Sequence, residues 1–180
     1  MPPWGFKSAW TLPMQGASAS RRADAVIAYI AWAGSRLTDD GLGVFVVPDS
    51  FAWNQVNHPI ETLGECGLNL ISYLLLPTGA FLPYTAALGG LVVVARKGTG
   101  RIFVGALSDG SNRNEVLLRN FNGGREGRDV GTGRLVAPAD FRGVRVLEAQ
   151  EQVGRTTARL GLAPKSVADV TRRRRLSCRC

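Results

Sequence analysis

Between Leu68 and Lys97 the chain carries two apolar runs separated by a turn-rich segment. The first run, Leu68 to Leu76, is too short for a typical packed helix and stops at Pro77, Thr78 and Gly79. The second run, Leu88 to Ala95, is rich in β-branched valine, which packs well on a pleated surface but forms helices poorly. The pattern predicts two buried strands joined by a loop.

The same stretch contains no charged side chain between Glu65 and Arg96, which is also a property of membrane-spanning helices. Pro77 and Pro83 would each remove a backbone hydrogen bond in the middle of such a helix. A pair of strands covered by helices on both faces has the same charge-free composition. We therefore expect a sheet at this position and no membrane segment.

The residues before Leu68 alternate between helical and extended patterns. Apolar positions from Ala23 to Leu37 recur at helical spacing, and Ser20 is the expected N-cap. Leu42 to Val47 is a short β-branched run that predicts a buried strand. A further helix is expected from Phe51, with a restart at the proline of Asn57 to Pro59.

This alternation of helices and strands predicts a largely parallel, doubly wound α/β sheet. The last two strands are an exception, because only about eleven residues separate Leu76 from Leu88 and a parallel crossover needs a longer connection. We therefore expect those two strands to pair antiparallel.

Charge is distributed unevenly along the 180 residues. Residues 1–100 carry 6 Lys and Arg against 6 Asp and Glu, whereas residues 101–180 carry 16 against 8. Five arginines lie in the last ten residues, among them Arg172, Arg173, Arg174 and Arg175, which we expect to contact nucleic-acid backbone from a disordered tail. A basic face that is simply solvated remains the alternative.

Cysteine and histidine are too few to support a disulfide framework or a metal site. Cys66, Cys178 and Cys180 are an odd number, and His58 is the one histidine in the chain. The N-terminus shows no secretory pattern. A reducing, cytoplasmic location is the simplest expectation.

Three segments carry a resemblance to a known family: VVPDSF at 46–51, LLLPTGAFLPYT at 74–85 and LVVVARK at 91–97. They resemble the later catalytic half of adenine-specific DNA methyltransferases, in particular the methylase subunits of type I restriction-modification systems. The resemblance covers residues 1–108 and implies a partial Rossmann-like sheet, S-adenosylmethionine-dependent, that ends in an antiparallel strand pair. It also implies methyl transfer from S-adenosylmethionine to the exocyclic amine of adenine in DNA.

The resemblance extends to the expected site residues. Met1-Pro2-Pro3-Trp4 is similar to the family's catalytic loop at its last three places, so Pro2 and Pro3 would shape the loop and Trp4 would stack on an extruded base. Met1 stands where the family has an Asn or Asp acceptor, and a thioether accepts hydrogen bonds only weakly. Phe81 and Tyr84 are expected near the target base, with plain packing on the helices as the alternative.

In the family, a glycine-rich cofactor loop precedes the Pro-Pro loop, and Gly131-Thr132-Gly133 cannot replace it because no buried strand leads into it. We therefore expect a truncated chain that is inactive alone: a gene fragment, the product of a wrong start site, or a half that joins a partner chain. The expected partners are a specificity subunit or a chain that supplies the missing N-terminal half.

We expect residues 109–171 to form a basic extension with short helices and residues 172–180 a disordered tail, with Gly123 to Gly133 flexible. The alternative function is a non-catalytic nucleic-acid-binding or assembly module.

Overall fold

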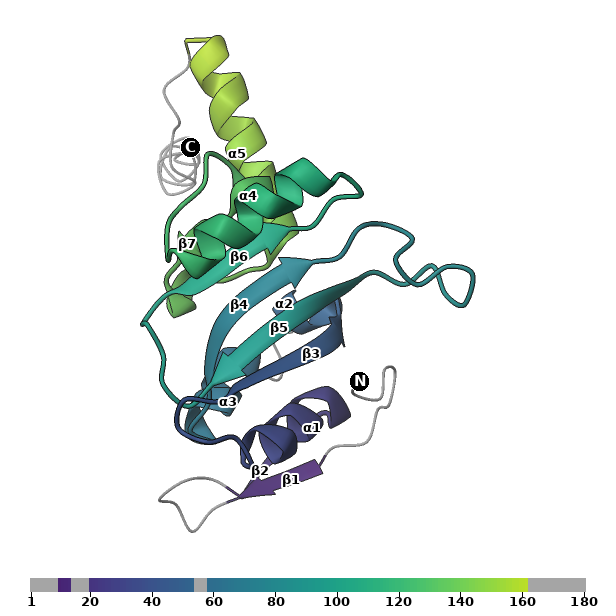
Figure 1. Cartoon of the computed structure of the whole chain (residues 1–180), viewed down its shortest axis with the longest axis vertical. Coiled ribbons are helices and arrows are strands. Elements are labelled where there is room, and N and C mark those ends of the chain that lie inside the picture. Colours follow the sequence, from purple (N-terminus) through teal and green to yellow (C-terminus); the bar gives the residue numbers. More distant parts are fainter. Residues whose placement is uncertain (1–9, 14–19, 54–57, 162–180) are drawn as a thin grey trace, which may run out of the picture. The chain divides into compact units, whose positions relative to one another are not determined.

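The computed structural model describes residues 10–13, 20–53 and 58–161. The chain divides into two compact units, Met1–Arg145 and Val146–Cys180. The first unit contains both sheets (Figure 1). The described part of the second unit is the length of helix α5, Val144–Arg159, that follows Arg145.

The main sheet has five strands in the order β3-β5-β4-β6-β7. Strand β5 lies between β3 and β4 and is antiparallel to both, so β3 and β4 run in the same direction. Strand β6 is parallel to β4, and β7 is antiparallel to β6. Their bounds are β3 Leu42–Pro48, β4 Asn69–Leu75, β5 Gly89–Ala95, β6 Ile102–Ala106 and β7 Arg134–Val136.

The two predicted strands around the central loop and their antiparallel pairing are confirmed. The predicted largely parallel arrangement is wrong, because β4 and β6 are the one parallel pair among the described neighbouring strands. The connection between β4 and β5 is short, so β5 pairs directly with β4. Strand β5 thereby lies between β3 and β4, which would be adjacent in a fully parallel sheet. The result is a mixed sheet of partial Rossmann-like type.

The two faces of this sheet are covered differently. Phe45, Val92 and Tyr73 lie opposite one another in the register and share the face that α1 contacts through Tyr29. Leu74 lies on the other face and packs with Phe103 against Leu117 of α4, Ser111–Asn122. In Figure 1, α2 (Ser50–Trp53) and α3 (Pro59–Glu65) lie behind the sheet, and α4 lies in front of β6.

Strand β3 is less buried than predicted. Leu42 and Val44 are each 61% exposed and lie on the face that carries α4. The cluster that Leu117 of α4 forms reaches as far as Leu91 of β5, and Leu42 and Val44 of β3 lie beyond it.

Helix α1, Ala25–Gly34, begins five residues later than its predicted cap. Asp24, not Ser20, is the N-cap, and its carboxylate accepts the Ile27 N–H at 2.9 Å. Ser20–Ala23 instead forms β2, which pairs antiparallel with β1, Trp10–Pro13. The predicted restart at Pro59 is confirmed, although residues 54–57 lie outside the described part.

Among the described residues, no helix combines the length and the apolar character that a membrane crossing requires.

A close contact between Gly90 on β5 and the Tyr73 ring on β4 generates the first prediction. A Cβ atom at Gly90 would lie 2.7 Å from Cζ of Tyr73, which is fully buried. Gly90→Ala should therefore lower the free energy of unfolding by about 1–3 kcal/mol through overpacking. Chemical denaturation measures this change.

Gly64→Ala is the matched control, because a Cβ atom there meets nothing within 4 Å and Gly64 lies in helix α3. That substitution should leave stability unchanged or raise it by up to about 1 kcal/mol. Equal effects of the two substitutions would contradict the packing account.

Candidate functional site

The carboxyl ends of β3, β4 and β6 meet at one edge of the sheet, because these three strands run in the same direction. Backbone hydrogen bonds join the residues at these strand ends. Asp49 N–H donates to Leu88 O at 3.0 Å, and Leu107 N–H donates to Leu75 O at 2.8 Å. In open α/β sheets, ligands bind outside the carboxyl ends of strands. This edge is therefore the candidate site, and the β4–β5 loop projects from it (Figure 1).

The β4–β5 loop, residues 76–88, is built from consecutive turns. Leu82 N–H donates to Gly79 O at 2.9 Å, and Tyr84 N–H donates to Phe81 O at 2.9 Å. Gly79 has a φ of 85°, which favours glycine, and the Leu82–Pro83 peptide bond is cis. The loop therefore holds its side chains on an ordered backbone.

Two predicted site residues lie on this loop in different environments. Phe81 is half-buried, whereas Tyr84 is 93% exposed. A ring so exposed does not pack on the helices, so the packing alternative does not apply to Tyr84. The remaining predicted residues, Pro2, Pro3 and Trp4 and the tail arginines Arg172 to Arg175, lie outside the described residues.

Asp49 connects three elements at the same edge. The Tyr73 hydroxyl donates to Asp49 Oδ1 at 3.1 Å, and Arg145 Nε lies 3.4 Å from Asp49 Oδ2. The Tyr73 ring also meets Phe141 edge-on, with centroids 5.7 Å apart. Both carboxylate oxygens of Asp49 are thus engaged, so Asp49 links the end of β3 to Tyr73 and Arg145 within the first unit.

The environment of Tyr73 keeps its hydroxyl protonated. Burial raises the pKa of Tyr73 well above its usual range, and the negative charge of Asp49 and the hydrogen bond to it raise it further. The positive charge of Arg145 lowers this pKa, but by less than burial raises it. Tyr73 is therefore a fixed hydrogen-bond donor.

Sequence reasoning singled out neither Asp49 nor Tyr73 as a site residue. The available signal was one hydroxyl-bearing aromatic residue within a largely apolar strand, four residues before Pro77. Its partner Arg145 lies 72 residues further along the chain, a separation that no local pattern bridges.

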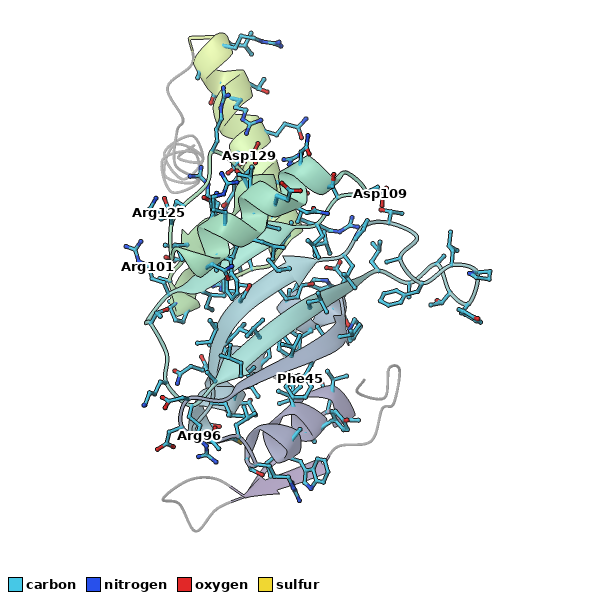
Figure 2. The ribbon with its side chains drawn as sticks, in the orientation of Figure 1. Phe45, Arg96, Arg101, Asp109, Arg125 and Asp129 are labelled. Atoms are coloured by element: carbon cyan, nitrogen blue, oxygen red, sulfur yellow. The ribbon has the colours of Figure 1, made fainter. Side chains whose placement is uncertain are left out.

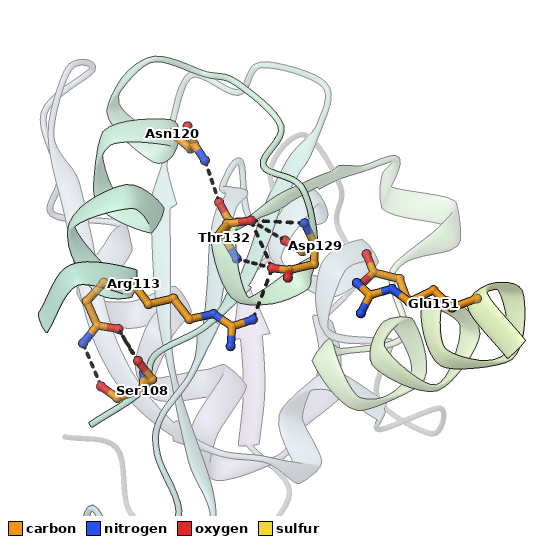
Figure 3. A network of polar contacts seen from close by, with 8 residues as sticks. Ser108, Arg113, Asn120, Asp129, Thr132 and Glu151 are labelled. Carbon is orange, nitrogen blue, oxygen red and sulfur yellow. Dashed lines mark hydrogen bonds and ion pairs between the residues drawn. The ribbon is translucent and has the colours of Figure 1, made fainter. Parts of the chain in front are cut away.

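The segment Gly123–Gly133 was expected to be flexible, and the structure corrects this expectation. Asp129 and Thr132 form a reciprocal capping box, and Asn120 Nδ2 donates to Thr132 O at 2.8 Å (Figure 3). The Arg113 guanidinium lies against Gly131, and the Phe103 ring lies against Gly133. These contacts fix a chain whose five glycines suggested mobility.

The same contacts decide whether this segment fits S-adenosylmethionine. A nucleotide cradle needs glycines open to the ligand between a strand and a helix. Here side chains already occupy the space beside Gly131 and Gly133. This segment therefore does not fit the cofactor. In the described part of the chain, no three His, Cys, Asp or Glu side chains gather at a metal-binding distance.

The Asp49–Tyr73 bond generates a pH prediction. A folded-state pKa above the unfolded value of about 10 gives stability that is complete below pH 10 and is lost as the pH rises above it. Between pH 10 and 11, the wild type should lose about 1 kcal/mol more unfolding free energy than Tyr73→Phe. Denaturant titrations at each pH measure the difference, and parallel curves above pH 10 would contradict it.

Comparison with known proteins relates the fold to one class of system. No family model and no curated protein matches the chain. A solved chain from a study of complex assembly and conformational transition in a type I restriction-modification system is 15% identical, with a TM-score of 0.52. The match covers 82% of this chain and 42% of that one.

A second solved chain is assigned as a modification subunit of a type I restriction enzyme from Vibrio vulnificus YJ016. It is 15% identical with a TM-score of 0.45, and the match covers 63% of this chain and 31% of that one. The chain thus spans well under half the length of the solved chains that it matches. At 15% identity, the first of these matches, with its TM-score of 0.52, shows a similarity of fold.

Proposed function

We propose that this chain forms the later part of the catalytic domain of an adenine-specific DNA methyltransferase in a type I restriction-modification assembly. The observation that carries the proposal is the β4–β5 loop at the carboxyl edge of a mixed sheet, with Tyr84 almost wholly exposed on it. The likeness of fold to a restriction-modification chain and the resemblance of residues 1–108 to these enzymes support it.

The proposed role of the loop is to receive the target base. An enzyme that modifies adenine inside a duplex must extrude the base and hold it, and aromatic rings provide stacking surfaces for this purpose. Tyr84 presents such a ring to solvent, and Phe81 is half-buried where the loop turns back. We further propose that Pro2, Pro3 and Trp4 act beside this loop, with Trp4 as a second stacking ring.

The cofactor belongs to a different part of the assembly. S-adenosylmethionine supplies the methyl group when bound, and we propose that strands outside the described residues, or on a second chain, hold it. The described residues orient the base: Asp49 and Tyr73 fix the edge of the sheet, and the turns of the loop direct Tyr84 outward. The proposed partners are therefore DNA, a specificity subunit and the cofactor-holding part, in the cytoplasm.

A non-catalytic module that binds nucleic acid is the second candidate. The engagement of both Asp49 oxygens favours it, because the Asp49 carboxylate is then not available as an amine acceptor. The two candidates differ in whether adenine methylation depends on Tyr84.

The test uses methyl-labelled S-adenosylmethionine and duplex DNA, with the full chain assayed alone and with the chains that co-purify with it. The complex should produce N6-methyladenine, detected by mass spectrometry of the nucleosides. Tyr84→Ala should lower kcat/KM about tenfold, since base stacking on an aromatic ring contributes about 1–3 kcal/mol.

Leu82→Ala is the matched control, because Leu82 lies on the same loop and is 63% exposed. It should change kcat/KM by less than about twofold, because it carries no ring on which a base can stack. Methylation of cytosine, absence of methylation with every partner, or equal losses for the two variants would contradict the proposal.

A further inference from the structure

Helix α4 and strand β6 form a β-α unit whose parts are joined by packing and hydrogen bonds. The Phe103 ring on β6 lies 5.3 Å from the Phe121 ring at the end of α4. At the other end, Asn114 Nδ2 donates to Ser108 O at 2.7 Å, while Ser108 N–H donates to Asn114 Oδ1 at 2.9 Å (Figure 3). The start of β6 and the end of α4 therefore lie together.

The chain that leaves α4 is held in place by hydrogen bonds. Arg125 N–H donates to Asn120 O at 2.9 Å, and Gly127 N–H donates to Gly133 O at 2.7 Å. The Asp129–Thr132 capping box follows, and hydrogen bonds from Thr132 together with the charge of Arg113 lower the pKa of Asp129, although burial opposes this. The backbone from residue 123 to 133 is thus fixed while its arginine side chains face solvent.

Three arginines are exposed at this end and make no ion pair with any residue in the described part of the chain. The two acids that follow Arg125 in the sequence are occupied, because Glu126 lies 4.0 Å from Arg134 and Asp129 lies 3.2 Å from Arg113. Figure 2 shows two of the three along the same margin of the unit. The three, named here the α4 arginine surface, are Arg101, Arg119 and Arg125.

Stabilisation of the α4 C-terminus does not by itself explain why these arginines gather here. A helix C-terminus favours positive side chains, which applies to Arg119 and Arg125. The last carbonyls of α4, however, already accept the N–H groups of Gly123, Gly124 and Arg125. The guanidinium groups remain free to meet an external anion.

We propose that the α4 arginine surface binds the phosphate backbone of duplex DNA. Exposed guanidinium groups on a fixed backbone suit phosphate oxygens, and neutralising phosphates releases counterions in a way that depends on salt but not on sequence. The inference rests on the proposed function for the choice of DNA as the polyanion. It adds a binding surface in the described chain to the contacts expected from the tail.

The position of this surface predicts where the contact falls on DNA. It lies at the amino end of β6, whereas the β4–β5 loop lies at the carboxyl edge. The five residues of β6 span about 17 Å, which corresponds to about five base pairs of duplex. The contacted phosphates should therefore lie about five base pairs or more from the base that the loop receives.

The test compares two double variants of the full chain that remove the same charge. Arg119→Gln with Arg125→Gln alters the proposed surface, and Lys97→Gln with Arg155→Gln removes two exposed charges that pair with Asp40 and Glu151. Fluorescence anisotropy gives the Kd for an unrelated duplex of about 20 base pairs at salt concentrations from about 50 to 200 mM. Circular dichroism verifies that each variant is folded.

The first double variant should reduce the slope of log affinity against log salt concentration by about 1.8. From about 50 to 200 mM salt, its affinity should therefore fall about tenfold less than that of the wild type. The control double variant should keep the wild-type slope within about 0.5. Equal slopes for all three proteins, or the same reduction in both double variants, would overturn the proposal. Unchanged DNA binding together with lost binding to a co-purifying chain would overturn it in favour of an acidic protein partner.

None of these outcomes depends on methyl transfer. A missing adenine product would contradict the proposed enzyme function while leaving the salt dependence to decide on the α4 arginine surface.

Discussion

The insertion of β5 between β3 and β4 is the constraint on which the rest of the structure depends. Its backbone pairs with strands on both sides, and Gly90 leaves room for the Tyr73 ring beside it. Because β5 is antiparallel to both neighbours, β3 and β4 run in the same direction and end at the same edge of the sheet. That edge then holds the Asp49–Tyr73–Arg145 contacts and the base of the β4–β5 loop.

Local patterns in the sequence predict the elements that depend on near neighbours. The charge-free runs interrupted by Pro77 identify β4, β5 and the loop between them, and the short connection requires antiparallel pairing.

Features that depend on distant partners could not be predicted in the same way. Ser20 resembles an N-cap, but its segment pairs with Trp10–Pro13 and leaves the cap to Asp24. The glycines of 123–133 suggest mobility, but Arg113 and Phe103 pack against them from other elements. The exposure of Val44 follows from the limited reach of α4, which no property of β3 reveals.

In the proposed complex with DNA, two surfaces of the described chain meet the two parts of the nucleic acid. Tyr84 offers an aromatic face to a base, and the α4 arginine surface offers positive charge to phosphates. They lie at opposite ends of the parallel strands, and the rigid sheet fixes the separation between them. One duplex bound to both would follow the side of the unit that α4 covers.

Amide hydrogen exchange of the full chain, with and without a duplex that carries an unpaired adenine, tests this account most directly. Residues 77–88 and 119–129 should exchange more slowly when DNA is bound, and the β5 amides should exchange slowly in both states, because they are paired on both sides. Slower exchange confined to residues 162–180, or no change in either predicted segment, would contradict the claim that this fold presents both surfaces to one DNA molecule.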